Sequence, residues 1–370
     1  MKAPLLPFQD WLEHYQEKHR ALSAQSQFIG YFCTYTPVEM IHAAGFIPVR
    51  ILGESGSLEK APSLVPSFIC HYMRRTLEKA LEEKYAYLSG LVQAYTCDVA
   101  CGLINIWAEN IRLDFYHTLP LPYNRTPEAR TYFRSILQEF IEKLNAHGGR
   151  LSWETLDQSL QLYRRIRKLL WILYQKRAAG RLNLSAKDVL TVVLAGFVTP
   201  PETYCEHLEI LVQDLSNDER MDGPKGFPVL VSGSLLENLS IMDALETLGF
   251  RIVADDLCSG LRSFYPVDGQ GDDPLDRLID RTVHHFPCPS RHRARDRFPL
   301  LMDLVRGAGA QGVIFLPQKF CTPHLADYPL LAEALNKEGL PHILLEMEDS
   351  GLTEAHRTRL EAFLEIHGCK

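Results

Sequence analysis

The chain of 370 residues lacks a long apolar run, since no stretch approaches the ~18 uninterrupted apolar residues of a membrane helix. Its first residues, MKAPLLPFQDWLEHYQEKHR, become polar too early for a secretory signal peptide. A basic excess is also missing, because 46 acidic against 39 basic residues give a formal charge of −7. We therefore expect a cytoplasmic protein that binds neither a membrane nor a nucleic acid.

Motifs of several catalytic classes are absent as well. The sequence contains no GxxxxGK(S/T) motif to hold the phosphates of ATP, and no GxGxxG motif follows a predicted strand. It contains no GxSxG motif, which would place a nucleophilic serine on a sharp turn. Cysteine pairs of the CxxC type, typical of structural zinc sites, are also missing. These absences disfavour a P-loop ATPase, a dinucleotide-binding enzyme, a serine hydrolase and a structural zinc protein.

What the chain does contain is a pattern of alternating strands and helices. Its hydrophobic content of 46% is that of a folded globular protein, which excludes a disordered chain. Strand patterns separated by helical patterns occur before residue 126 and again after residue 226, and such alternation predicts parallel sheets covered by helices. We therefore predict an α/β fold with two doubly wound parallel-sheet domains, at 1–126 and 226–370, and a helical segment at 127–225.

The nine cysteines are placed unevenly along these predicted elements. Cys33, Cys258 and Cys321 follow predicted strands, whereas Cys70 and Cys97 begin predicted helices. The carboxyl ends of parallel strands build ligand sites, and a helix N-terminus favours a thiolate. An odd number of cysteines in a reducing compartment does not form a disulfide framework, which leaves core thiols, reactive thiols or metal ligands. Five thiols at one edge are not a core pattern, and their joint placement favours metal ligands. Thiolates from distant loops suit an iron-sulfur cluster better than zinc.

The remaining thiols outside these positions have simpler explanations. Cys205 and Cys369 are expected to be ordinary packing or terminal residues. Cys97 and Cys101 share a helix face, but the CxxxC spacing is a weak signal, and packing explains Cys101 better. The acidic run EMED at 346–349 follows a predicted strand and could be a carboxylate site, but a solvated loop end explains it better.

Five segments in the same order resemble the D-component family of 2-hydroxyacyl-CoA dehydratases and benzoyl-CoA reductases. The resemblance extends over about residues 29–349, and the helical segment 127–225 contributes no matching motif. The matching segments are GYFCTYTPVEMIHAAGFIPVR, CDVA at Cys97, DDLCSGLRSF at 255–264, HFPCPSRHR at 285–293 and GVIFLPQKFCTPH at 312–324.

The resemblance implies a [4Fe-4S] cluster held by three cysteines of one subunit, with one iron open to substrate. The matching positions in this sequence are Cys70, Cys97 and Cys321. It also implies a lyase: a separate ATP-hydrolysing activator protein delivers a low-potential electron, which passes to the thioester carbonyl of a 2-hydroxyacyl-CoA, and the resulting ketyl radical loses the hydroxyl group. The absent ATP-binding motif fits this division of labour. A homodimer, or a heterodimer with a related subunit, is the implied assembly.

Two alternatives stay open at this point. One branch of the family carries an [8Fe-9S] double cubane and acts as an ATP-dependent reductase, and Cys33, Cys258 and Cys288 could supply its additional ligands. The other alternative is a non-catalytic subunit that relays electrons to its partner. For the phosphates of the acyl-CoA substrate, the sequence offers Arg262, Arg291 and Arg293 without a spacing rule that selects among them.

Overall fold

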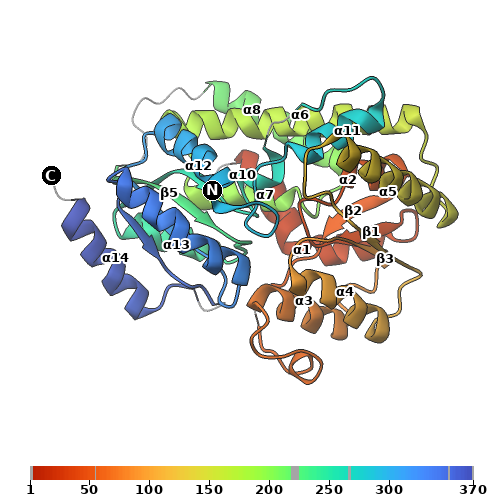
Figure 1. Ribbon diagram of the computed structural model, residues 1–370, viewed down its shortest axis with the longest axis horizontal. Helices are drawn as coiled ribbons and strands as arrows, with labels where there is room; N and C mark the ends of the chain where they lie inside the picture. The colour runs from red at the N-terminus through yellow and green to blue at the C-terminus, as the bar shows by residue number, and fades with distance from the viewer. Residues whose placement is uncertain (1–2, 55, 218–224, 266–267, 349–350, 369–370) are drawn as a thin grey trace.

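The computed structural model describes residues 3–54, 56–217, 225–265, 268–348 and 351–368, and the structural statements below concern these residues. They fold into two lobes, each built on a four-stranded parallel sheet. Figure 1 shows the two lobes side by side along the long axis of the molecule. The predicted class, two parallel-sheet domains with a helical middle segment, is confirmed.

The first sheet has the strand order β2-β1-β3-β4, and every neighbouring pair is parallel. Its strands are β1 (Phe28–Tyr31), β2 (Ile47–Arg50), β3 (Leu88–Ala94) and β4 (Phe115–Leu119). The connecting helices are α2 (Val38–Ala43), α3 (His71–Leu81) and α4 (Asp98–Asn110). All four residues of β1 are buried, as expected for a central parallel strand covered on both faces.

The second sheet repeats this topology with the order β6-β5-β7-β8. Its strands are β5 (Phe227–Gly233), β6 (Phe250–Asp256), β7 (Gly312–Leu316) and β8 (His342–Leu344). The helices α9 (Ser240–Thr247), α10 (Leu261–Phe264), α12 (Ala294–Ala308) and α13 (Thr322–Lys337) follow the strands. In both sheets the strand order reverses beside the first strand, and ligands of open α/β sheets bind at such switch points.

The backbones of β5 and β7 approach closely at the switch point of the second sheet. A Cβ atom on Gly233 would lie 2.3 Å from the carbonyl oxygen of Leu316, so only glycine fits there. This close approach brings the loops that follow β5 and β7 together at the edge of the sheet.

The helical segment contains α5 (Pro127–Ala146), α6 (Trp153–Ala178), α7 (Ala186–Ala195) and α8 (Pro201–Asn217). Ser152 and Ser185 begin α6 and α7 with capping boxes, in which side chains satisfy amide groups at the helix start. Helix α6 contacts α2 of the first lobe and β6 of the second, and Figure 1 shows it along the top of both lobes. The helical segment therefore joins the lobes. The exact limits at 126 and 225 stay a prediction, since residues 218–224 lie outside the described part.

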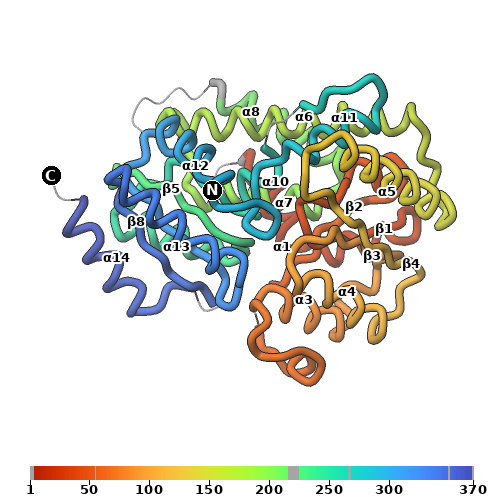
Figure 2. The backbone as a smooth tube through the Cα atoms, viewed as in Figure 1, coloured from red at the N-terminus to blue at the C-terminus, as the bar shows by residue number. Residues whose placement is uncertain are grey.

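Among the described residues, four α-helices have no counterpart in the prediction: the short α10 and the longer α1 (Leu6–Leu22), α11 (Pro274–Val283) and α14 (Glu354–His367). Helix α1 contacts α7. Helix α14 lies on the outer side of the second lobe, at the blue end of the tube in Figure 2. Within the described ranges, no helix is both long and apolar enough to cross a membrane.

Helix α11 belongs to the second half of the chain but packs against the first lobe. Its apolar residues Leu275 and Leu278 share a core cluster with Phe133 of α5. Ion pairs reinforce this contact, including Arg130 with Asp280 at 2.7 Å. The segment that follows α11 therefore carries Cys288 into the same core cluster, against which Cys33 also packs.

Candidate functional site

The three cysteines matched to the cluster ligands occupy equivalent positions in the fold. Each is the N-cap residue of its helix: Cys70 of α3, Cys97 of α4 and Cys321 of α13. We call them the capping cysteines. Phe320, directly before Cys321, has a φ of 64°, a left-handed conformation that residues other than glycine rarely adopt. Such strain concentrates at functional loops, because the surrounding structure must hold it in place.

Burial governs the protonation of the capping cysteines. It raises the pKa of Cys97 to about 12 and the pKa values of Cys70 and Cys321 above their ordinary range. In each case a backbone N–H of the third helical residue acts in the opposite direction, because it stabilises the thiolate. The neighbouring thiols Cys70 and Cys97 further raise the pKa of Cys321, so the three groups share one electrostatic environment.

The second set comprises Cys33, Cys258 and Cys288, which we call the arginine-side cysteines. Arg50 donates through Nη1 to the carbonyl oxygen of Cys258 at 2.8 Å. Arg262 directs Nη1 to the sulfur of Cys288 at 3.7 Å. Burial, followed by the nearby thiols of Cys258 and Cys288, raises the pKa of Cys33 to about 11. Two buried guanidinium groups therefore face this set.

The two sets adjoin each other. Besides burial and Cys70, the thiols of Cys33 and Cys288 contribute to the raised pKa of Cys97. His324 lies between the sets, with Nδ1 at 3.2 Å from the sulfur of Cys321 and Nε2 at 3.2 Å from Nη2 of Arg262. The structure thus gathers all six predicted cysteines in one region between the lobes.

Arg262 is held in place by a buried charge network. It is 1% exposed, and its Nε lies 2.9 Å from Oδ1 of Asp256. Arg297 pairs with the other oxygen of Asp256 at 2.8 Å and also with Asp327. This network fixes the guanidinium against Cys288. It also makes Arg262 unsuitable as a contact for substrate phosphates, which corrects one of the three sequence candidates.

The donor set fits an iron-sulfur cluster. Within the described residues, no three cysteine, histidine or carboxylate side chains are arranged to hold a single metal ion. A cubane requires a different arrangement, because each thiolate binds a separate iron atom. The cysteine sulfur atoms therefore lie further apart than those around a single metal ion. Buried thiols with raised pKa values become thiolates when a cationic centre replaces their protons. The assignment of Cys70, Cys97 and Cys321 as ligands stays a prediction.

The two other cysteines that the structure describes, Cys101 and Cys205, are compatible with the packing role expected from the sequence. Cys205 is 4% exposed and packs in the main hydrophobic core. Cys101 is half-buried on α4. Cys369 lies outside the described residues.

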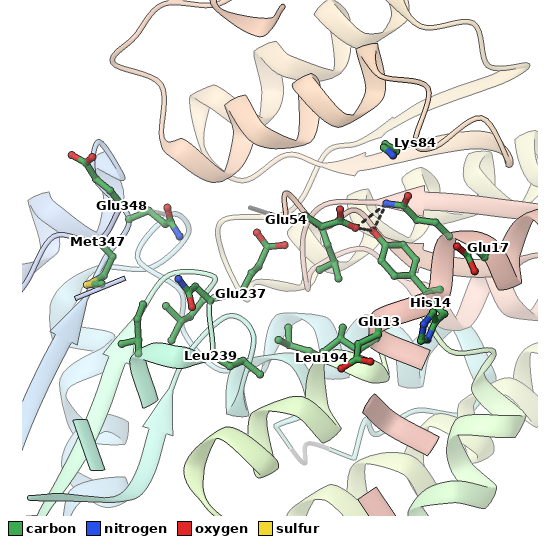
Figure 3. Close-up of a pocket in the computed structure, with 18 of the residues that line it drawn as sticks. Glu13, His14, Glu17, Glu54, Lys84, Leu194, Glu237, Leu239, Met347 and Glu348 are labelled. Carbon is green, nitrogen blue, oxygen red and sulfur yellow. Dashed lines mark hydrogen bonds between the residues drawn. The ribbon is translucent and has the colours of Figure 1, made fainter. Parts of the chain in front are cut away.

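An acidic crevice opens between the lobes on the side of the capping cysteines. Its volume is about 540 Å³, and the backbone carbonyl of Gln318, a residue of its lining, accepts a hydrogen bond from the backbone N–H of Cys321 at 2.9 Å. Figure 3 shows Glu54 of the first lobe beside Glu237 of the second, and Oε1 of Glu237 accepts from the amide of Gly53 at 2.7 Å. The carboxylates that line the crevice are Glu13, Glu17, Glu54, Glu237 and Glu348.

The lining of the acidic crevice was only partly visible in the sequence. Glu348 belongs to the EMED run; its side chain is 54% exposed, as expected for a solvated loop end, and it lines the crevice together with residues of α1. Asp349 of that run lies outside the described residues. The crevice carries more carboxylates than basic groups, so it repels phosphate groups.

Comparison with known proteins gives one family and several relatives. The family model described as 2-hydroxyglutaryl-CoA dehydratase, D-component, matches residues 33–367 and so includes the helical segment and α14. The (R)-phenyllactyl-CoA dehydratase beta subunit of Clostridium sporogenes is 28% identical over 97% of both chains. A benzoyl-CoA reductase subunit of Thauera aromatica is 28% identical, over 91% of this chain and 90% of its own. The (R)-2-hydroxyglutaryl-CoA dehydratase beta subunit of Acidaminococcus fermentans is 25% identical over 91% of both.

Proposed function

Since the chain belongs to the 2-hydroxyglutaryl-CoA dehydratase D-component family, we propose that it is an iron-sulfur subunit of a 2-hydroxyacyl-CoA dehydratase. The reaction would be the elimination of water from a 2-hydroxyacyl-CoA. The observation that carries the proposal is the position of Cys70, Cys97 and Cys321, each at a helix N-terminus and all in one electrostatic environment.

In this proposal the capping cysteines hold a [4Fe-4S] cluster. Such a cluster, when bound, accepts a low-potential electron and offers one iron without a thiolate to polarise a carbonyl oxygen. The helix N-termini supply backbone N–H groups that stabilise thiolate charge. The three cysteines are only partly exposed, which limits the access of water to their sulfur atoms.

The proposed partners follow from the relatives and from the motifs that the sequence lacks. Three relatives are named as subunits of larger enzymes, which supports an assembly with a related subunit or with a second copy of this chain. An ATP-hydrolysing activator would supply the electron, because the sequence contains no P-loop motif.

Iron and sulfide analysis of the full chain, purified without oxygen, tests this function. We expect about four irons per chain and the electron paramagnetic resonance signal of a reduced cubane. Cys70→Ser, Cys97→Ser and Cys321→Ser should each lose most of the iron, whereas Cys205→Ser, a buried cysteine in the main core, should retain it. A folded chain without iron and sulfide would contradict the proposal.

A second candidate is an ATP-dependent reductase with an [8Fe-9S] double cubane. The specific support is that Cys33, Cys258 and Cys288 adjoin the capping cysteines. This alternative predicts about eight irons per chain, of which Cys258→Ser should lose about half. If the chain holds about four irons and Cys258→Ser does not change that number, the double cubane is refuted and the dehydratase proposal stands.

A further inference from the structure

A second large cavity, separate from the acidic crevice, lies beside the arginine-side cysteines. Its volume is about 570 Å³, within the range of ligand pockets. The loop after β4 forms one wall and the segment after α11 forms another. We call it the arginine pocket, because three arginines line it. The lining residues used in the argument are Tyr35, Tyr123, Arg125, Arg291, His292 and Arg295.

The charge of the arginine pocket is positive. Its charged lining consists of Arg125, Arg291 and Arg295 against one carboxylate, Asp296. Arg291 is 8% exposed and donates to the backbone carbonyl groups of Tyr95 and Pro122. Within the described residues, neither Arg291 nor Arg125 forms an ion pair with a carboxylate. The structure thus leaves guanidinium charge uncompensated, and the planar donors suit phosphate oxygens.

An exposed aromatic ring accompanies this charge. Tyr123 is 74% exposed, and the guanidinium carbon of Arg291 lies 3.9 Å from the centre of its ring. A purine base can stack on such an aromatic and guanidinium surface while its phosphate groups pair with neighbouring arginines. The combination is the chemistry that recognises a phosphorylated adenine nucleotide.

The inner wall of the pocket adjoins the cysteines. Nδ1 of His292 accepts from the backbone N–H of Cys288 at 3.3 Å and lies 3.4 Å from the hydroxyl group of Tyr35. Tyr35 follows Cys33 by two residues. A ligand with its phosphates among the arginines can therefore extend its other end toward the region where the cysteines gather.

We propose that the arginine pocket binds the 3′-phosphoadenosine diphosphate part of an acyl-CoA, with the pantetheine arm directed past Tyr35. This inference rests on the proposed function, which supplies the acyl-CoA substrate. The acidic crevice cannot take the same role, because its carboxylates repel the three phosphates of coenzyme A. Of the earlier candidates, Arg291 lines the pocket, whereas the exposed Arg293 does not.

Calorimetric titration of the full chain with coenzyme A tests the inference. The double variant Arg125→Ala/Arg295→Ala removes two exposed side chains and should weaken binding by about 10- to 100-fold, the range for charge-assisted hydrogen bonds. Tyr123→Ala should weaken it by about fivefold to tenfold, because one stacking surface is lost. Arg293→Ala is the matched control, since it removes an exposed arginine of the same segment outside the pocket.

The choice of ligands separates coenzyme A from other adenine nucleotides. Dephospho-coenzyme A should bind more weakly than coenzyme A, and ADP and ATP more weakly still. Equal or tighter binding of ATP would overturn the assignment to coenzyme A. If the folded chain does not bind coenzyme A, or if Arg293→Ala weakens binding as much as the double variant does, the arginine pocket is not the binding site.

Failure of this inference can be told apart from failure of the proposed function. Titration needs no turnover, and iron content is measured independently. A chain that holds iron and sulfide but binds coenzyme A without the arginine pocket would refute only the inference. A chain that binds coenzyme A in the arginine pocket but holds no iron would refute only the proposed function.

Discussion

The two sets of cysteines differ in what surrounds their sulfur atoms. The capping cysteines face the amide groups of helix N-termini, and burial raises their pKa values. The arginine-side cysteines adjoin Arg50 and Arg262, which are both 1% exposed. Negative charge on the second set is therefore balanced in part by guanidinium groups, whereas backbone amide groups at the helix starts stabilise negative charge on the first set.

From this difference we expect separate roles for the two sets. Thiols whose negative charge is stabilised mainly by backbone amide groups gain most from binding a positively charged metal centre. A set beside fixed guanidinium groups can stabilise additional negative charge, such as that of a reduced cluster or of a bound anion. The following predictions test this division.

The largest expected effect concerns Arg262. Arg262→Gln removes the guanidinium beside Cys288 and leaves the buried Asp256 with Arg297 and the hydroxyl group of Ser232 as its partners. We expect the free energy of unfolding to fall by about 3 to 5 kcal/mol, because a buried carboxylate loses one partner. Urea denaturation measures this change.

Arg306→Gln is the control for this comparison. Arg306 pairs with Glu338 at 3.4 Å, but both side chains are largely exposed, and their loss should cost less than about 1 kcal/mol. Equal effects of the two substitutions would show that the buried network does not stabilise the arginine side.

The next prediction concerns how fast the thiols of the two sets react with an alkylating reagent. In iron-free protein the thiolate fraction of Cys97, with a pKa of about 12, should be roughly 1000-fold below that of an ordinary thiol at pH 8. For Cys33, with a pKa of about 11, the reduction should be roughly 100-fold. Alkylation by iodoacetamide, followed by mass spectrometry of each peptide across pH 7 to 10, measures both.

The sign of this pH dependence is fixed by the raised pKa values. Alkylation of both thiols should accelerate about tenfold per pH unit throughout this range, without levelling off. A plateau for Cys97 below pH 10 would mean that a positive group stabilises its thiolate. The capping set would then not depend on a bound cation.

The smallest effect concerns acid stability on the arginine side. Burial, and next the charge of Arg281, lowers the pKa of His285 to about 3. The unfolded chain binds the proton near pH 6.5, so stability from this group is complete above that pH and is lost as the pH falls toward 3. We expect His285→Asn to reduce the pH dependence of the free energy of unfolding by up to about 1.4 kcal/mol per pH unit in this window.

The adjacent His284 provides the matched control. Its side chain is 45% exposed, and His284→Asn should change the pH dependence less than His285→Asn does. Denaturant titrations at several pH values between 4 and 7 give the slope for each variant. If the two substitutions had the same effect, the buried environment of His285 would not be the cause.

The sequence predicted the sheets well because buried parallel strands are recognisable as short apolar runs. The segment FPVLVSG was predicted as a strand with its turn, and all of it lies in β5. Helix α11 was missed, because its charged residues suggested a loop insertion whereas they form ion pairs with α5. The acidic crevice was also missed, since its lining combines α1, the loops after four strands and residues of α7 and α9.

By itself the sequence determined which thiols stand at helix starts and strand ends, because capping and strand patterns are local and depend on neighbouring residues. It placed Cys70 and Cys97 at helix starts without any knowledge of the tertiary contacts. The tertiary structure alone decided that Cys288 reaches the region of Cys33, because α11 packs across to the first lobe. It also decided that Arg262 is a buried charge facing a thiol and that Arg291 lines a cavity, since burial and charge pairing depend on residues distant in the chain.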